Sequence, residues 1–225
     1  MGSATPPLDA EAWVFDLDNT LYPAGAGLFE QVEPRMGRFI EERFGLDAEG
    51  ARRVQKQGFR DHGSTMRFLM LEHGIAPRDF LEYVHDIDYG VLKPDQQLDA
   101  ALARIAGRKF VFTNAAANHA RRVLDRLGIT HHFTAVFDIA DADWQPKPMR
   151  AAYDRLVAQQ DLDAPRTVMI EDIARNLAPA AALGMTTVWL RNNRHGWATD
   201  GAEDGHIDHV IDDLAGWLRR VAPRR

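Results

Sequence analysis

The stretch "VFDLDNTLYP", residues 14–23, places two acidic residues directly after a short apolar run. That run, Trp13 to Phe15, is continuous rather than alternating, which is typical of a strand covered on both faces in a parallel sheet. Asp16 and Asp18 stand two positions apart, so their side chains lie on the same side of an extended segment. A buried strand that ends in two carboxylates predicts a functional site at that end of the sheet.

Further apolar runs predict the other strands of this sheet. From residue 108 onward they alternate with segments of helical apolar spacing, at residues 120–127 and 149–157 and, more briefly, at 176–184. Strands that alternate with helices imply right-handed βαβ units, and therefore an α/β fold with a parallel sheet. The remaining predicted strands are residues 109–112, 135–137, 167–170, 186–190 and 209–211.

Residues 24–94 differ from the rest because they contain helical patterns but no convincing strand. An apolar stripe from Phe29 to Ile40 predicts one helix, and Pro34 requires that this helix begin near it or kink. Residues 64–74 and 77–86 predict two more helices, the first with Ser64 as its N-cap. We therefore expect a helical insertion between the first strand and the rest of the sheet.

The composition narrows the class of protein. With 225 residues, the chain is long enough for one large domain or for a domain with a sizeable insertion. Its net charge of -6 argues against a nucleic-acid polymer as partner, because such binding needs a basic face. We expect neither a secretory signal nor a membrane span, and the absence of cysteine suits a cytoplasmic protein. The oligomeric state is left open.

Polar residues gather where the predicted strands end, and ligands of open parallel sheets bind outside those ends. Crowded carboxylates raise one another's pKa unless a cation intervenes. The nine histidines show no ligand spacing with supporting acids, so none is assigned to a metal, and oxygen ligands favour Mg²⁺. A lysine nearby suits an anionic substrate, for which a phosphoryl group is the natural choice. The polar residues are Asp16, Asp18, Thr113, Asn114, Lys147, Glu171 and Asp172.

Each of these residues has a simpler interpretation when it is taken alone. Asp16 and Asp18 would suit a turn, as would Thr113 and Asn114. A single lysine is most often solvated, and two acids at the start of a helix would face its dipole. The case for a site depends on the residues occurring together.

Four short motifs, in order and spacing, resemble those of the haloacid-dehalogenase-like phosphohydrolases. The resemblance implies a Rossmann-like core of residues 1–23 and 95–225 with a helical cap, residues 24–94, inserted after the first strand. The motifs are "DLDNT" (16–20), "FTNA" (112–115), "PKP" (146–148) and "EDIARN" (171–176).

The same resemblance implies a role for each polar residue. Asp16 would be the nucleophile that forms an aspartyl-phosphate, and Asp18 the general acid and base. Thr113 and the backbone around Asn114 would hold phosphate oxygens, while Lys147 would neutralise charge. Mg²⁺ would bind the Asp16 carboxylate, the Asp18 backbone carbonyl and Asp172, with Glu171 as a ligand or as a residue that supports the ligands.

The cap is expected to choose the substrate, a small-molecule phosphate ester. Residues 59–88, with 16–23 and 112–129, resemble the pyrimidine 5′-nucleotidase branch, which implies a pyrimidine nucleoside 5′-monophosphate. Ser64 and Thr65 would then hydrogen-bond ribose or base, and Arg67 would pair with phosphate. Ser64 also suits an N-cap and Arg67 also suits solvent, so these assignments and that of His62 are open.

Other functions share the same core residues. A phosphatase acting on phosphoglycolate or a sugar phosphate is the nearest alternative to a nucleotidase. A phosphomutase would isomerise a sugar phosphate without net phosphate release. A non-catalytic phosphate-binding scaffold would require a missing motif residue, and none is missing. Dehalogenases of this superfamily typically lack a second acid at the position of Asp18, so its presence favours phosphoryl transfer.

Overall fold

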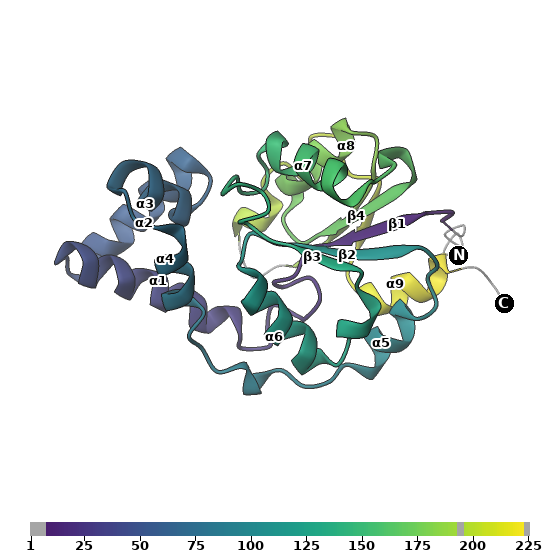
Figure 1. The fold of residues 1–225 in the computed structure, drawn as a ribbon, viewed down its shortest axis with the longest axis horizontal. Coiled ribbons are helices and arrows are strands. Elements are labelled where there is room, and N and C mark those ends of the chain that lie inside the picture. The colour runs from purple at the N-terminus through teal and green to yellow at the C-terminus, as the bar shows by residue number, and fades with distance from the viewer. Residues whose placement is uncertain (1–7, 193–195, 223–225) are drawn as a thin grey trace.

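The computed structural model describes residues 8–192 and 196–222. A six-stranded parallel sheet forms its centre, in the order β3-β2-β1-β4-β5-β6 (Figure 1). The first strand therefore lies between β2 and β4 in the middle of the sheet, as a doubly covered strand should. The strands are β1 (Ala12–Phe15), β2 (Arg108–Phe112), β3 (Ala135–Phe137), β4 (Thr167–Glu171), β5 (Thr186–Leu190) and β6 (His209–Ile211).

Helices cover both faces of this sheet, which explains the continuous apolar runs. Trp13 and Phe15 pack into the core shared with α5, α6 and α9, whereas Ala12 and Val14 pack into the core shared with α7. Figure 1 shows these two layers on opposite sides of the strands. The helices are α5 (Gln96–Leu102), α6 (Ala117–Leu127), α7 (Arg150–Gln160), α8 (Ala178–Ala182) and α9 (Leu214–Val221).

Four helices between β1 and α5 form a separate helical group beside the sheet (Figure 1). Their buried residues make a third hydrophobic cluster, to which the core contributes Ile139. The predicted α/β fold with a helical insertion after the first strand is confirmed, and we call this insertion the cap. Its helices are α1 (Phe29–Phe44), α2 (Ala48–His62), α3 (Thr65–His73) and α4 (Pro77–Val84).

Local structure departs from the sequence expectations in three places. Helix α1 begins at Phe29 and includes Pro34, so the proline lies in its second turn. Helix α2 has no counterpart among the predicted helices. The helix expected at 176–184 is instead a 3-10 turn followed by the five-residue α8. The short 3-10 helices are η1 (Tyr89–Val91), η2 (Thr130–His132), η3 (Ala164–Arg166), η4 (Ala174–Leu177) and η5 (Gly196–Thr199).

Across the described residues, none of the helices combines the length and the apolar character that crossing a bilayer requires.

Candidate active site

A buried lysine joins two of the sheet-end acids. Lys147 Nζ donates to Asp16 Oδ1 at 2.6 Å and to the Phe112 carbonyl at 2.9 Å, and it lies 2.9 Å from Glu171 Oε1. The lysine is 3% exposed, so little solvent screens these contacts. Because both carboxylates stabilise its charged form, the pKa of Lys147 is raised despite burial. The ammonium group is therefore fixed on the expected nucleophile.

Three carboxylates crowd together at this end of the sheet. One oxygen each of Asp16, Glu171 and Asp172 lie within 4.8 Å of one another, and Asp16 Oδ2 is buried without a hydrogen-bond partner. Burial raises the pKa of Asp16 to about 7, against the opposing pull of Lys147, and burial with neighbouring acids raises that of Asp172 well above its ordinary value. These are the features of a cluster that fits a divalent cation with oxygen ligands.

Glu171 is better placed to support this cluster than to bind a metal. Its Oε1 accepts from Asn176 Nδ2 at 2.6 Å, and its Oε2 accepts from the Ile173 backbone at 2.8 Å. Together with Lys147, these partners lower the pKa of Glu171 in spite of its burial. The side chain is thereby held ionised with both oxygens engaged. Asn176, the last residue of the fourth motif, thereby orients the loop through Glu171.

Asp18 has a different environment from that of Asp16. Its Oδ1 accepts from Tyr22 Oη at 2.6 Å and lies 2.9 Å from His119 Nε2. Because a carboxylate can only accept, Nε2 carries the proton in this contact. Burial favours the neutral acid, but the charge and hydrogen bond of His119, with that of Tyr22, hold the pKa of Asp18 at about 2. The two acids of the first motif are thus tuned in opposite directions.

Sequence reasoning did not identify the histidines near Asp18. His119 Nδ1 lies 2.9 Å from Tyr89 Oη, and His85 stacks on the His119 ring with centroids 4.1 Å apart. Burial, and then the charge of His119, lower the pKa of His85 to about 3. The available signal was position: His119 lies in the first turn of α6, which starts just beyond the end of β2.

Thr113 and Asn114 follow β2 and shape the neighbouring loops. Thr113 is buried, and its hydroxyl accepts from the Ala115 backbone at 3.0 Å. The Asn114 side chain accepts from the Lys147 backbone N–H at 2.8 Å and donates to the Lys147 carbonyl at 3.4 Å. Asn114 therefore fixes the loop that carries the lysine, a task that the sequence had not assigned to its side chain.

A cavity of about 600 Å³ joins these residues to the cap. Asp16, Asp18, Thr113 and Lys147 line it on the core side, and Ser64 and Thr65 line it on the cap side. The seven core residues singled out from the sequence all border this cavity. The fold thus brings together loops that are more than a hundred residues apart along the chain.

The four cap residues proposed from the sequence divide into two groups. Ser64 is the N-cap of α3, accepting from the Arg67 backbone at 3.0 Å, and it lines the cavity with Thr65. His62 and Arg67 are not among the described lining residues. His62 lies 3.5 Å from Glu72, and Arg67 donates to Gln145 at 3.1 Å across to the core. In this structure Arg67 connects cap and core rather than facing the cavity.

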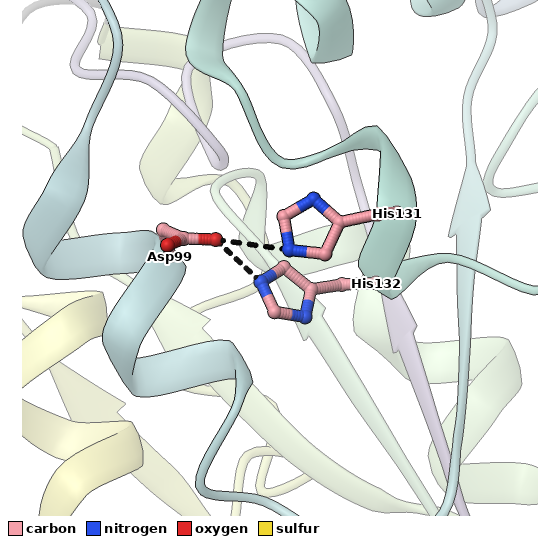
Figure 2. A group of neighbouring side chains, drawn as sticks. All are labelled: Asp99, His131 and His132. Atoms are coloured by element: carbon pink, nitrogen blue, oxygen red, sulfur yellow. Dashed lines mark hydrogen bonds and ion pairs between the residues drawn. The ribbon is translucent and has the colours of Figure 1, made fainter.

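A second group of potential metal ligands lies away from the cavity, just before the start of β3. Figure 2 shows Asp99 of α5 against two neighbouring histidines of η2. Asp99 Oδ1 lies 2.7 Å from His132 Nε2 and 3.2 Å from His131 Nε2. The contacts connect α5 to the turn before β3. Sequence spacing did not reveal this group because Asp99 is supplied by a distant helix.

The comparison with known families agrees with this geometry. A family model described as haloacid dehalogenase-like hydrolase matches residues 10–184. The chain therefore belongs to the haloacid dehalogenase-like hydrolase family, and the class expected from the four motifs is confirmed.

Individual relatives are distant. The chain is 28% identical over 241 residues to a ribulose-1,5-bisphosphate 5-phosphatase of Halopiger xanaduensis, covering 91% of this chain and 96% of that protein. It is 24% identical over 221 residues to Phosphate metabolism protein 8 of Saccharomyces cerevisiae, covering 90% of this chain but 62% of the yeast protein. The magnesium-bound hydrolase YfnB of Bacillus subtilis matches with a TM-score of 0.61 at 15% identity, covering 96% and 99% of the two chains. At that identity the match shows the fold alone.

Proposed function

We propose that this protein is a Mg²⁺-dependent phosphomonoesterase that works through an aspartyl-phosphate on Asp16. The observation that carries the proposal is the pairing at the cavity floor: Asp16 is held by Lys147, and a second acid, Asp18, stands two residues on. Transfer of a phosphoryl group needs a nucleophile, a cation and a proton donor. Asp16, Lys147 and Asp18 supply these in turn. The proposal is supported by the chain's family membership and by the name of the Halopiger relative, which is a phosphatase.

The proposed reaction has two steps, formation of the aspartyl-phosphate and its hydrolysis. An Asp16 oxygen forms a bond to phosphorus while the ester P–O bond breaks, and its electron pair leaves with the alkoxide oxygen. Asp18 gives a proton to that oxygen and then takes one from the water that attacks the phosphorus of the intermediate. Phosphate and free Asp16 are the products. Lys147 offsets negative charge on Asp16 and the phosphoryl group throughout.

Asp18 must carry a proton for the first step, whereas His119 and Tyr22 hold its pKa at about 2 and so favour the ionised form in the unliganded chain. An approaching phosphate dianion would raise that pKa, because like charges disfavour the charged form. Asp18 would therefore take up a proton from solvent as the substrate binds, and its hydrogen bond with His119 positions it for both steps.

The acidic cluster fits Mg²⁺ by its chemistry. Asp16 and Asp172 carboxylates, with the Asp18 backbone carbonyl, would hold the ion, and Glu171 would support them. Asp16 Oδ2 is a buried acceptor without a partner among the described residues, and burial with neighbouring acids raises the pKa of Asp16 and of Asp172 in spite of Lys147, so a further cation would stabilise both carboxylates. The bound ion supplies charge neutralisation at the phosphoryl oxygens.

Two substrate classes follow from different features of the cap. The likeness to pyrimidine 5′-nucleotidases favours a nucleoside monophosphate, with Ser64 and Thr65 on the sugar or base, and the aromatic wall of Phe59 and Phe80 would suit a base. The alternative is a compact anionic metabolite such as phosphoglycolate or a sugar phosphate. Three basic lining residues of α2, Arg52, Lys56 and Arg60, favour it. We place the activity in the cytoplasm, in keeping with a cysteine-free chain.

A phosphate-release screen with Mg²⁺ tests the proposal. We expect release from p-nitrophenyl phosphate and from at least one metabolite ester, with no release after EDTA or in Asp16→Asn. Activity that survives EDTA would remove Mg²⁺ from the account. Isomerisation of a sugar phosphate without free phosphate would instead identify a mutase, and a chain that binds esters without turnover would be a scaffold.

A further inference from the structure

Helix α2 turns a row of cations toward the cavity. Its lining residues are spaced by three or four positions, as one face of a helix requires. Three of them, Arg52, Lys56 and Arg60, are basic and exposed, and none is acidic. In a chain with a net charge of -6, such a concentration of positive charge on one cavity wall needs an explanation.

The neighbouring face of α2 shows what an ordinary solvated face looks like in this protein. It is made of Glu49, Arg53, Gln57 and Asp61, all exposed. Arg53 pairs with Glu49 at 2.6 Å, and Gln57 donates to Asp61 and accepts from Arg60 at 2.6 Å. Among the described residues, the cations of the cavity face have no acidic partner. The two faces therefore differ in the compensation of charge as well as in its sign.

The core adds a fourth cation to the same wall. Arg175, within the fourth motif, also lines the cavity, and its guanidinium carbon lies 4.8 Å from the centroid of the Phe59 ring on α2. Its Nε is buried without a hydrogen-bond partner. Stacking on an aromatic ring fixes the plane of a guanidinium while leaving its edge free for a planar anion. Core and cap thus converge on one cationic region.

Two acids, Glu33 and Asp200, also border the cavity, and neither forms a described ion pair with these four cations. The cavity wall away from the floor therefore has an excess of positive charge. The phosphoryl group to be transferred is already served by Lys147 and the acidic cluster at the buried floor, so a second role is needed for the exposed cations.

We infer that Arg52, Lys56, Arg60 and Arg175 form a subsite for a second anionic group, a phosphate or a carboxylate, at the far end of the substrate. The inference rests on the proposed phosphomonoesterase function and narrows its substrate to esters with two anionic groups. Guanidinium groups from three arginines and one lysine ammonium match the oxygens of either anion. A nucleoside monophosphate would leave this subsite without its ligand.

Matched substrate pairs test the subsite. Within each pair the two esters share a carbon skeleton and differ by the second anion: 2-phosphoglycolate with 2-hydroxyethyl phosphate, and ribulose 1,5-bisphosphate with ribulose 5-phosphate. In at least one pair, we expect kcat/KM to be about tenfold or more higher for the doubly anionic ester, mainly through KM, since several exposed pairs each contribute modestly. The preference should shrink as ionic strength rises.

A charge-removal variant identifies the residues. In Arg52→Gln/Lys56→Gln/Arg60→Gln the preference should fall to near unity, while p-nitrophenyl phosphate, which has one anionic group, is hydrolysed as before. Arg53→Gln, on the solvent face of the same helix, is the matched control and should retain the preference. A wild-type enzyme that hydrolyses p-nitrophenyl phosphate but prefers the singly anionic member of every pair, or UMP, overturns the subsite. So does a preference that survives in the triple variant. Failure to hydrolyse even p-nitrophenyl phosphate would count against the proposed function itself.

Discussion

Lys147→Met removes the single cation that the described residues place between Asp16 and Glu171. The two contacts that are lost are 2.6 Å and 2.9 Å long, at a side chain that is 3% exposed. Methionine fills a similar volume but leaves two buried acids without compensation. Breaking a buried ion pair in this way costs about 3–5 kcal/mol. In a protein of this size that corresponds to a fall in Tm of about 6–20 °C.

The loss should depend on pH in a predictable direction. The pKa of Asp16 is about 7 in the folded chain and 3.8 ordinarily, so folding favours its protonated form. A raised folded-state pKa gives stability that is present below the unfolded value and is lost as pH rises through the folded value. Without Lys147 that pKa rises further, so the deficit of the variant should be smaller near pH 5, where Glu171 alone has lost the partner of its charge, than near pH 8, where Asp16 has lost it too.

Thermal and urea unfolding in EDTA, at pH 5 and pH 8, measure this deficit. Asp16→Asn/Lys147→Met should recover part of the stability at pH 8, because one of the uncompensated charges is gone. Lys93→Met, at an exposed lysine, is the control and should change stability by no more than about 0.5 kcal/mol. A Lys147→Met protein as stable as wild type at pH 8, or with an equal deficit at both pH values, would refute the reasoning.

Three further predictions concern other parts of the structure. Mg²⁺ should raise Tm more at pH 8 than at pH 5, since deprotonation of Asp16 above its pKa of about 7 creates the charge that the ion offsets; an equal shift at both pH values in thermal scans would contradict this. His119→Asn should raise the pKa of Asp18 by about 1–3 units and, because Asp18 must be protonated for the first step, move the alkaline limb of the kcat/KM profile upward; an unmoved limb would exclude this coupling. Gly58→Ala should lower the unfolding free energy by about 1–3 kcal/mol, because its Cβ would lie 2.4 Å from the Phe68 ring; chemical denaturation that shows no loss would disprove this packing.

The strands were predictable from sequence, but one cap helix was not. The inner strands are covered on both faces, so most of their residues are apolar and stand out as runs. Helix α2 buries only Gly50, Ala51 and Gly58 among its residues, so it has no apolar stripe to reveal it. It packs by close approach, with Gly58 against Phe68, and such packing has no signature in hydrophobic periodicity.

The site residues at the strand ends were predictable from sequence, whereas the contacts made by residues from distant parts of the chain were not. The acids and Lys147 lie at strand ends, and a parallel sheet places those ends along one edge, so their meeting could be foreseen. The environment of Asp18 could not, since His119, Tyr89 and His85 come from three different elements and have no sequence spacing in common. The cap residues were the hardest, because Ser64 serves both as a helix cap and as a lining residue.

The covalent role of Asp16 is the central claim, and mass spectrometry of acid-quenched enzyme tests it most directly. Enzyme mixed with saturating substrate and Mg²⁺, quenched during turnover and digested, should yield the peptide containing Asp16 with the added mass of one phosphoryl group. The modification should vanish on mild alkaline treatment, as an acyl phosphate does, and should be absent from Asp16→Asn. Turnover without a phosphorylated peptide, or with the group on another residue, would contradict the account.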